Sequence, residues 1–179
     1  SPETPIYHKG SNLYGLSWAR HSIRREESAL VVEGYMDVVS LAAHGFENVV
    51  APLGTALTPE QAKLLSRYTK RVLLLFDSDA AGIRATFKAG DTLLEAGLHP
   101  AVVTLPPGED PDTLVRSEGR EGLEQYLDQA VDVLDRKLQI LDEKDYFSSI
   151  ERTRSAVDRL LPTIRAASDP ALHDIYVAK

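Results

Sequence analysis

The stretch LLLFDSDAAG, residues 73–82, decides the fold, because a short apolar run ends in Asp77, Ser78 and Asp79 and a helix-forming segment follows. Side chains at positions i and i+2 of an extended strand point to the same side. Both carboxylates are therefore expected to face one spot. Carboxylates at close range repel each other unless a positive group lies between them. The pattern predicts a positively charged partner at the end of this strand.

The apolar run at residues 71–77 has three counterparts, at residues 29–34, 47–54 and 99–108. Each run is followed by a segment with helical spacing, and Thr58, Pro59 and Gln61 form a strong helix start after the second run. The runs are continuous and rich in Val and Leu, which is typical of parallel strands covered on both faces. We therefore expect an α/β fold with about four parallel strands flanked by helices.

The chain changes character at about residue 121, where strand signals end and amphipathic helical patterns continue. A last helix is expected to start near Asp169 and Pro170 and to be cut off at Lys179. This part predicts a small helical subdomain after the sheet.

The composition sets limits on the chemistry. The 179 residues include no cysteine, so disulfides and cysteine-bound zinc are excluded, and the formal net charge is −7. A nucleic-acid-binding domain that acts alone is usually basic. We find no apolar run of the roughly 18 residues that a membrane-spanning helix needs and no signal-peptide pattern. The first residue is Ser1, so the chain is expected to be an excised fragment.

Acidic residues gather where the expected strands end. Ligands of open parallel α/β sheets sit at the carboxyl ends of the strands. Carboxylates without cysteine or a histidine pair suit hard cations such as Mg²⁺ or Mn²⁺. The candidate ligands after the first, third and fourth runs are Glu33, Asp37, Asp77, Asp79, Asp110 and Asp112.

Four of these six acids also have a purely structural interpretation. Asp79 and Asp110 can serve as helix N-caps, and Asp112 can face a helix dipole from the first turn. Asp37 alone is more often a solvated helix residue. Glu33 differs, because a Glu that ends an apolar strand is costly without a partner. Glu33 together with the two aspartates of the third run is much stronger evidence than those aspartates alone.

Four blocks together resemble the Toprim domain of bacterial DnaG-type DNA primases: VVEGYMDVVSL (31–41), PLGTALT (52–58), LLLFDSDAAG (73–82) and PPGEDPDTLVR (106–116). SPETPIYHKGSNLYGL (1–16) resembles the segment that leads into Toprim in that family. The resemblance implies a lead-in segment at residues 1–28, a Toprim domain at 29–120 and a helical subdomain at 121–179.

The resemblance implies a DNA-directed RNA polymerase that makes RNA primers on single-stranded DNA for replication, by metal-dependent nucleotidyl transfer. Glu33, Asp77 and Asp79 would be catalytic and would hold metal, with Asp37, Asp110 and Asp112 as further metal ligands. More than one Mg²⁺ or Mn²⁺ ion is expected. Nucleoside triphosphates would be bound with the help of Lys9, Gly34 and Gly54, although for Gly54 a simple turn explains the residue equally well.

The resemblance also implies partners that this chain would meet elsewhere. A single-stranded DNA template and an RNA primer are expected, and a replicative helicase and single-strand-binding protein would be bound through parts absent here. No membrane partner is expected, and the place of action would be the bacterial cytoplasm at the replication fork. A zinc module and a basic polymerase subdomain have no counterpart in the chain, so we expect a catalytic-core fragment with poor activity by itself.

Other functions stay open at this point. Another Toprim enzyme, a topoisomerase or a nuclease, would need a different surrounding pattern. A phosphate-handling hydrolase or phosphoacceptor receiver places its key Asp after the first strand, whereas here that strand ends in Glu33. A non-catalytic regulatory module that binds metal or nucleotide has no need for so many acids at one edge.

Overall fold

A six-stranded sheet forms the centre of the molecule in the computed structural model, which describes residues 9–52, 54 and 56–179. The strand order is β1-β3-β2-β4-β5-β6. Its inner strands are β2 (Ser28–Val31), β3 (Val49–Pro52), β4 (Arg71–Leu74) and β5 (His99–Val102). β2 pairs in parallel with β3 and β4, and β4 with β5. The four parallel strands expected from the apolar runs are confirmed.

The structure contains two short edge strands that the sequence pattern does not predict. β1 (Leu13–Tyr14) pairs antiparallel with β3, and β6 (Val131–Asp132) pairs antiparallel with β5. The expectation of no strand after residue 120 is therefore wrong. A strand of two residues is too short to show alternation, and it forms here because a partner edge is available.

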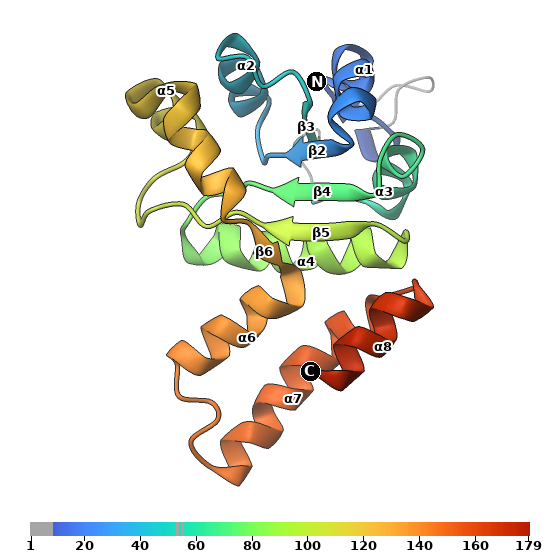
Figure 1. Ribbon diagram of the computed structural model, residues 1–179, viewed down its shortest axis with the longest axis vertical. Coiled ribbons are helices and arrows are strands. Elements are labelled where there is room, and N and C mark those ends of the chain that lie inside the picture. The colour runs from blue at the N-terminus through green and yellow to red at the C-terminus, as the bar shows by residue number, and fades with distance from the viewer. Residues whose placement is uncertain (1–8, 53, 55) are drawn as a thin grey trace.

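Helices cover both faces of the sheet (Figure 1). The helices beside the sheet are α1 (Leu16–Glu26), α2 (Tyr35–Ala43), α3 (Pro59–Leu65), α4 (Ala80–Glu95) and α5 (Pro111–Asp128). Val72 and Leu74 join one buried cluster with α1, α3 and α4, whereas Leu73 and Leu75 join a second with α2 and α5. All four of these residues are buried, which explains why the strand reads as continuously apolar.

The helix start predicted at Thr58 is confirmed. The Thr58 side chain accepts a hydrogen bond from the Gln61 backbone N–H (3.1 Å), and the Thr58 N–H donates to Gln61 Oε1 (3.1 Å). Gln61 Nε2 also donates to the Asn12 carbonyl (2.7 Å), and Thr58 Oγ1 donates to the Gly10 carbonyl. The cap of α3 therefore also fastens the short helix η1 (Lys9–Ser11) and the chain leading into β1.

The C-terminal helices pack under the sheet against α4 (Figure 1). They are α6 (Val133–Glu143), α7 (Ile150–Ala166) and α8 (Pro170–Ala178). Asp91 of α4 accepts hydrogen bonds from Lys137 Nζ (3.3 Å) and Thr163 Oγ1 (2.5 Å), which joins three helices. α5 passes the expected domain boundary at residue 120, with a non-helical Gly119 (φ 71°) inside it. None of the helices in the described part of the chain is long and apolar enough to cross a membrane.

Candidate metal centre

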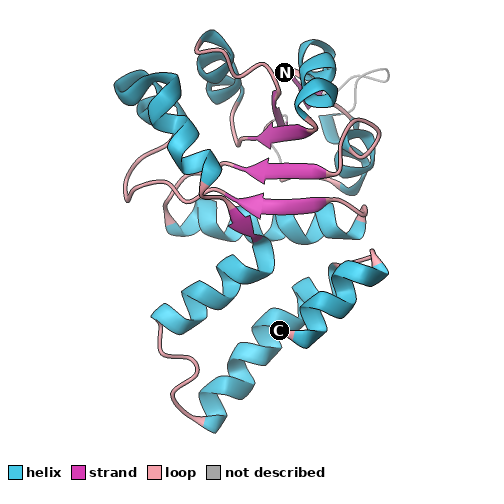
Figure 2. Ribbon diagram, in the orientation of Figure 1, coloured by secondary structure: helices cyan, strands magenta, loops and turns pink. Residues whose placement is uncertain are grey.

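The carboxyl ends of the parallel strands face the same side of the sheet, as the arrowheads in Figure 2 show. Glu33 follows β2, and Asp77 and Asp79 follow β4 at that edge. The chain after β5 reaches Asp110 at the start of α5, while Asp37 lies in the first turn of α2. The parallel topology thus brings together acids that are far apart in the sequence.

Glu33 lies against the turn between β4 and α4. The Asp77 backbone N–H donates a hydrogen bond to Glu33 Oε1 (3.3 Å). The same oxygen would lie 3.1 Å from a Cβ placed on Gly82, so only a residue without a side chain lets this contact form freely. The contact joins the ends of β2 and β4.

Two of the acids are helix caps, as their structural interpretation predicts. Asp79 Oδ1 accepts from the Gly82 N–H (2.7 Å) at the start of α4. Asp110 Oδ1 accepts from the backbone N–H (2.7 Å) and the hydroxyl (2.5 Å) of Thr113 at the start of α5. These bonds use one oxygen of each carboxylate, so capping and cation binding are compatible for the same side chain.

Asp37 and Asp112 also have local partners. The Gly34 N–H donates to Asp37 Oδ2 (3.0 Å), so Gly34 starts α2 and fixes this acid. Asp112 Oδ2 pairs with Arg116 Nη1 one turn later in α5 (3.5 Å). Such an exposed pair within a helix contributes little stability, about 0.3–0.5 kcal/mol.

Three of the acids have a raised pKa: Glu33, Asp37 and Asp77. Burial is the main cause of the raised pKa of Glu33 and of Asp77, and the neighbouring carboxylates add to it. Burial, with the charges of Asp77, Asp110 and Asp112, raises the pKa of Asp37 to about 6. By contrast, hydrogen bonds from Thr113 lower the pKa of Asp110. Burial and the neighbouring carboxylates thus both disfavour the charged forms of Glu33, Asp37 and Asp77 at this edge.

The type of ligand atom at this edge suits a hard divalent cation. All candidate ligands are carboxylate oxygens, which Mg²⁺ and Mn²⁺ prefer. Within the described residues, no three acidic or histidine side chains converge closely enough to hold a metal ion as they stand. Binding would therefore require these side chains to close in. Glu109 Oε2 is also buried without a hydrogen-bond partner in the described part, as a carboxylate awaiting a cation would be.

Glu109 is absent from the candidates drawn from sequence, although it lies in the GEDPD block. For the expected nucleotide-binding residues, the structure says less. Lys9 begins η1, but its side chain lies outside the described residues. Gly54 has a positive φ of 72°, and a Cβ at this position would have no atom within 4 Å, which supports its role as a turn before the Thr58 cap. Nucleotide binding by these residues stays a prediction.

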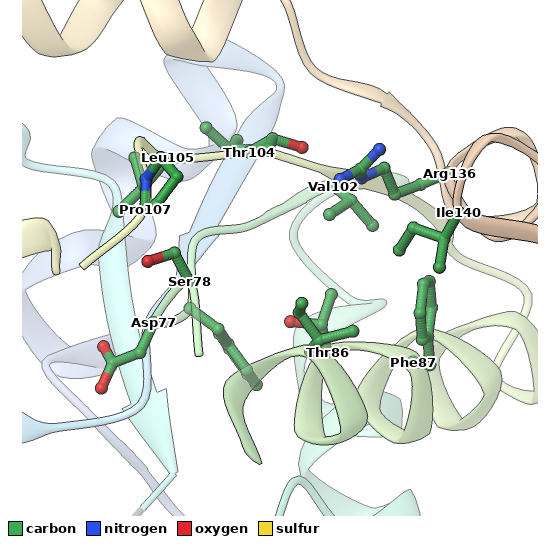
Figure 3. Close-up of a pocket in the computed structure, with 13 residues that line it drawn as sticks. Asp77, Ser78, Thr86, Phe87, Val102, Thr104, Leu105, Pro107, Arg136 and Ile140 are labelled. Atoms are coloured by element: carbon green, nitrogen blue, oxygen red, sulfur yellow. The ribbon is translucent and has the colours of Figure 1, made fainter. Parts of the chain in front are cut away.

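A cavity of about 170 Å³ adjoins the acidic edge (Figure 3). Asp77 and Ser78 line one end, and Phe87 of α4 with Arg136 and Ile140 of α6 line the other. The sequence gives no sign of this cavity, because α6 reaches it only through the packing of the C-terminal helices.

We expect Asp37→Asn to raise the melting temperature of the metal-free chain by about 2–4 °C at neutral pH, the shift that about 1 kcal/mol produces at this size. The folded state binds the Asp37 proton more tightly than the unfolded state, because the pKa is about 6 instead of 3.8. The stabilisation from this proton is fully present below the unfolded pKa and is lost as pH rises through the folded pKa. Asn carries no charge and can still accept from the Gly34 N–H.

Calorimetry in EDTA, at pH values between about 4 and 7.5, checks this expectation. The gain from Asp37→Asn should shrink as the pH falls from about 6 to about 4, because Asp37 is then protonated in the folded state and the pH approaches the unfolded pKa of 3.8, below which it is neutral in both states. An equal gain at every pH would show that removing the charge is not the cause.

Comparison with known proteins shows which family the chain resembles. Residues 30–115 match a family model described as Toprim-like. The DNA primase of Clostridium acetobutylicum is 41% identical over 180 residues, covering 100% of this chain and 30% of that protein. The DNA primase of Aquifex aeolicus is 46% identical over 127 residues, covering 71% of this chain and 26% of that protein. The chain thus spans less than a third of these curated relatives.

Solved structures agree over nearly the whole chain. The zinc-binding and RNA polymerase domains of Aquifex aeolicus primase superpose with a TM-score of 0.87 at 35% identity, covering 99% of this chain and 42% of that chain. A DnaG primase catalytic domain bound to single-stranded DNA gives a TM-score of 0.85 at 38% identity, covering 99% and 58%. The chain is therefore homologous to the catalytic core of bacterial DnaG-type DNA primases, and its residues 30–115 match the Toprim-like family.

Proposed function

We propose that the chain is the metal-binding part of a primase, a DNA-directed RNA polymerase that makes RNA primers on single-stranded DNA. The observation that carries this proposal is the gathering of acids from three strand ends at one edge of the sheet, where burial and neighbouring carboxylates raise the pKa of Glu33, Asp37 and Asp77. Similarity to DNA primases along the whole chain favours this function over a topoisomerase, a nuclease or a regulatory module.

In this proposal, Glu33, Asp77 and Asp79 hold the catalytic metal, and Asp37, Asp110 and Asp112 complete the acidic site. Bound divalent ions, Mg²⁺ or Mn²⁺ and more than one, supply charge neutralisation for the triphosphate and activation of the primer hydroxyl. The protein's own contribution is placement. The caps of α4 and α5 hold one oxygen of Asp79 and of Asp110 on rigid helix starts, which leaves the other oxygen for a cation.

The wider role rests on the relatives. The catalytic domain bound to single-stranded DNA supports a template for this chain as well. With a net charge of −7, the chain needs basic segments from outside its own sequence to hold that template. We include a replicative helicase and single-strand-binding protein as partners through such outside segments, and the bacterial cytoplasm at the replication fork as the location. We also propose, from the similarity to these relatives, that the chain divides into a lead-in segment (1–28), a Toprim domain (29–120) and a helical subdomain (121–179).

The test of this function has a binding arm and a synthesis arm. Nucleoside triphosphates should bind to residues 1–179 with Mn²⁺ present and should lose that binding in EDTA, because the acidic edge repels a triphosphate without a cation. Primer synthesis on single-stranded DNA should be poor with this chain alone. It should appear with a longer chain that adds the basic polymerase subdomain implied by the resemblance to DnaG-type primases.

Isothermal titration and a primer-extension gel measure the two arms. Glu33→Gln in the longer chain is the control, because it removes a candidate ligand and should abolish synthesis. Nucleotide binding that is unchanged in EDTA would contradict a metal-dependent site, and a longer chain that makes primers equally well with Glu33→Gln would contradict the proposed catalytic role.

A further inference from the structure

One hydroxyl group joins the two loops that carry the aspartates. Ser78 lies between Asp77 and Asp79 in the loop from β4 to α4. Its Oγ donates a hydrogen bond to the Glu109 carbonyl (3.2 Å) and accepts one from the Gly108 N–H (2.9 Å). A serine hydroxyl has one proton to donate, so the donor and an acceptor position are both used.

The loop to which Ser78 is hydrogen-bonded forms a tight turn at residues 106–109. The Glu109 N–H donates to the Pro106 carbonyl (3.1 Å), and Gly108 has a φ of 85°, which glycine adopts readily. Asp110 follows directly and caps α5. Figure 3 shows Ser78 beside Asp77, next to the loop that carries Pro107. The position of Asp110 is therefore set by the turn that Ser78 holds.

The sheet itself no longer joins the two loops at this point. In the described residues, the last main-chain hydrogen bond between the ends of β4 and β5 runs from the Val103 N–H to the Leu74 carbonyl (3.0 Å). Ser78 lies four residues beyond Leu74, and Gly108 lies five residues beyond Val103. Burial and then the charge of Asp110 raise the pKa of Asp77, so the two loops carry acids close enough to interact unfavourably when both are charged.

We propose that Ser78 is a positioning residue, which clamps the β4–α4 loop to the β5–α5 loop so that both groups of aspartates face the same cation. The inference rests on the proposed metal-dependent function and adds to it a residue that touches neither metal nor nucleotide. A hydroxyl is suited to this place, because a carboxylate would add negative charge beside Asp77 and an aliphatic side chain would bind neither the Gly108 N–H nor the Glu109 carbonyl and so would not join the two loops.

Two measurements on Ser78→Ala test the clamp. In the metal-free chain, hydrogen exchange of the Gly108 amide should become faster. Calorimetric titration should show Mn²⁺ affinity lower by about 10-fold, the lower end of the range seen when groups that orient metal ligands are removed. Ser78→Thr keeps the hydroxyl and should restore both values toward wild type.

The matched control is Ser66→Ala, which removes a hydroxyl that donates to the Lys63 carbonyl three residues earlier (2.9 Å) and should change neither measurement. A double-mutant cycle then asks how Ser78 acts. If Ser78 works by placing Asp110, the loss of affinity from Ser78→Ala should be smaller in an Asp110→Asn background.

Wild-type exchange at Gly108 in Ser78→Ala, or unchanged Mn²⁺ affinity despite faster exchange, would overturn the clamp. The clamp would also be overturned if Ser78→Ala lowered Mn²⁺ affinity by the same factor in the Asp110→Asn background as in wild type. Failure of the wild-type chain to bind Mn²⁺ at all would instead overturn the metal site and with it the proposed function. The exchange measurement in metal-free protein would still show whether Ser78 holds the two loops together.

Discussion

The variant with both Asp77→Asn and Asp79→Asn should lose Mn²⁺ affinity by more than about 100-fold, yet unfold at the same or a higher temperature without metal. Loss of ligands should exceed the roughly 10–100-fold effect of losing groups that only orient them. The folded chain should not suffer, because like charges at this edge repel. Asn also remains a good N-cap, so the Gly82 N–H keeps its partner at position 79.

Titration calorimetry and thermal unfolding in EDTA measure these two effects. The control carries Asp158→Asn and Asp174→Asn, which remove the same charge from exposed positions on α7 and α8. It should bind Mn²⁺ like wild type. Wild-type affinity in the Asp77, Asp79 variant would contradict the assignment, and a strong loss of metal-free stability would show that these carboxylates are needed for the fold itself.

Gly82→Ala is expected to damage both the fold and the site. A Cβ at this position would lie 2.2 Å from the Asp77 carbonyl oxygen and 3.1 Å from Glu33 Oε1. The carbonyl belongs to the backbone, so the turn between β4 and α4 must move. Overpacking of this kind costs about 1–3 kcal/mol or more, and Mn²⁺ affinity should fall because Asp77 and Glu33 are displaced together.

Chemical denaturation and the same metal titration check this result. Gly10→Ala is the matched control, because its Cβ would make only an ordinary contact of 3.5 Å with Thr58 Cγ2. It should leave Mn²⁺ affinity unchanged and cost little stability. If Gly82→Ala were as stable as the Gly10 variant and bound Mn²⁺ normally, the close approach of Gly82 to Asp77 would be needed neither for stability nor for metal binding.

The inner part of the fold could be predicted because local pattern and tertiary environment agree there. Residues 72–75 are apolar at every position, and the structure buries them alternately on two faces. The rule that parallel strands end at one edge then brings Glu33 and Asp77 together from sequence alone. The two-residue strands β1 and β6 could not be predicted, since nothing in two residues specifies a partner edge.

Details of the site depended on contacts that no short pattern encodes. The helix-cap interpretation of Asp79 and Asp110 is confirmed. Each cap uses one carboxylate oxygen, so capping does not exclude the proposed role of either residue as a metal ligand. The sequence did not indicate a role for Ser78, because its hydrogen-bond partners Gly108 and Glu109 lie about 30 residues away in the chain. Its role becomes visible only when β5 is placed beside β4.

Anomalous scattering from crystals of this chain soaked in Mn²⁺ tests the central claim most directly. The account predicts peaks at the carboxyl edge of the sheet, with Glu33, Asp77 and Asp79 in contact with Mn²⁺ and their side chains drawn together. The account would be contradicted if, at a high Mn²⁺ concentration, peaks appeared only at other surface acids. In that case Glu33 and Asp77 would show no bound Mn²⁺ and no change in side-chain position.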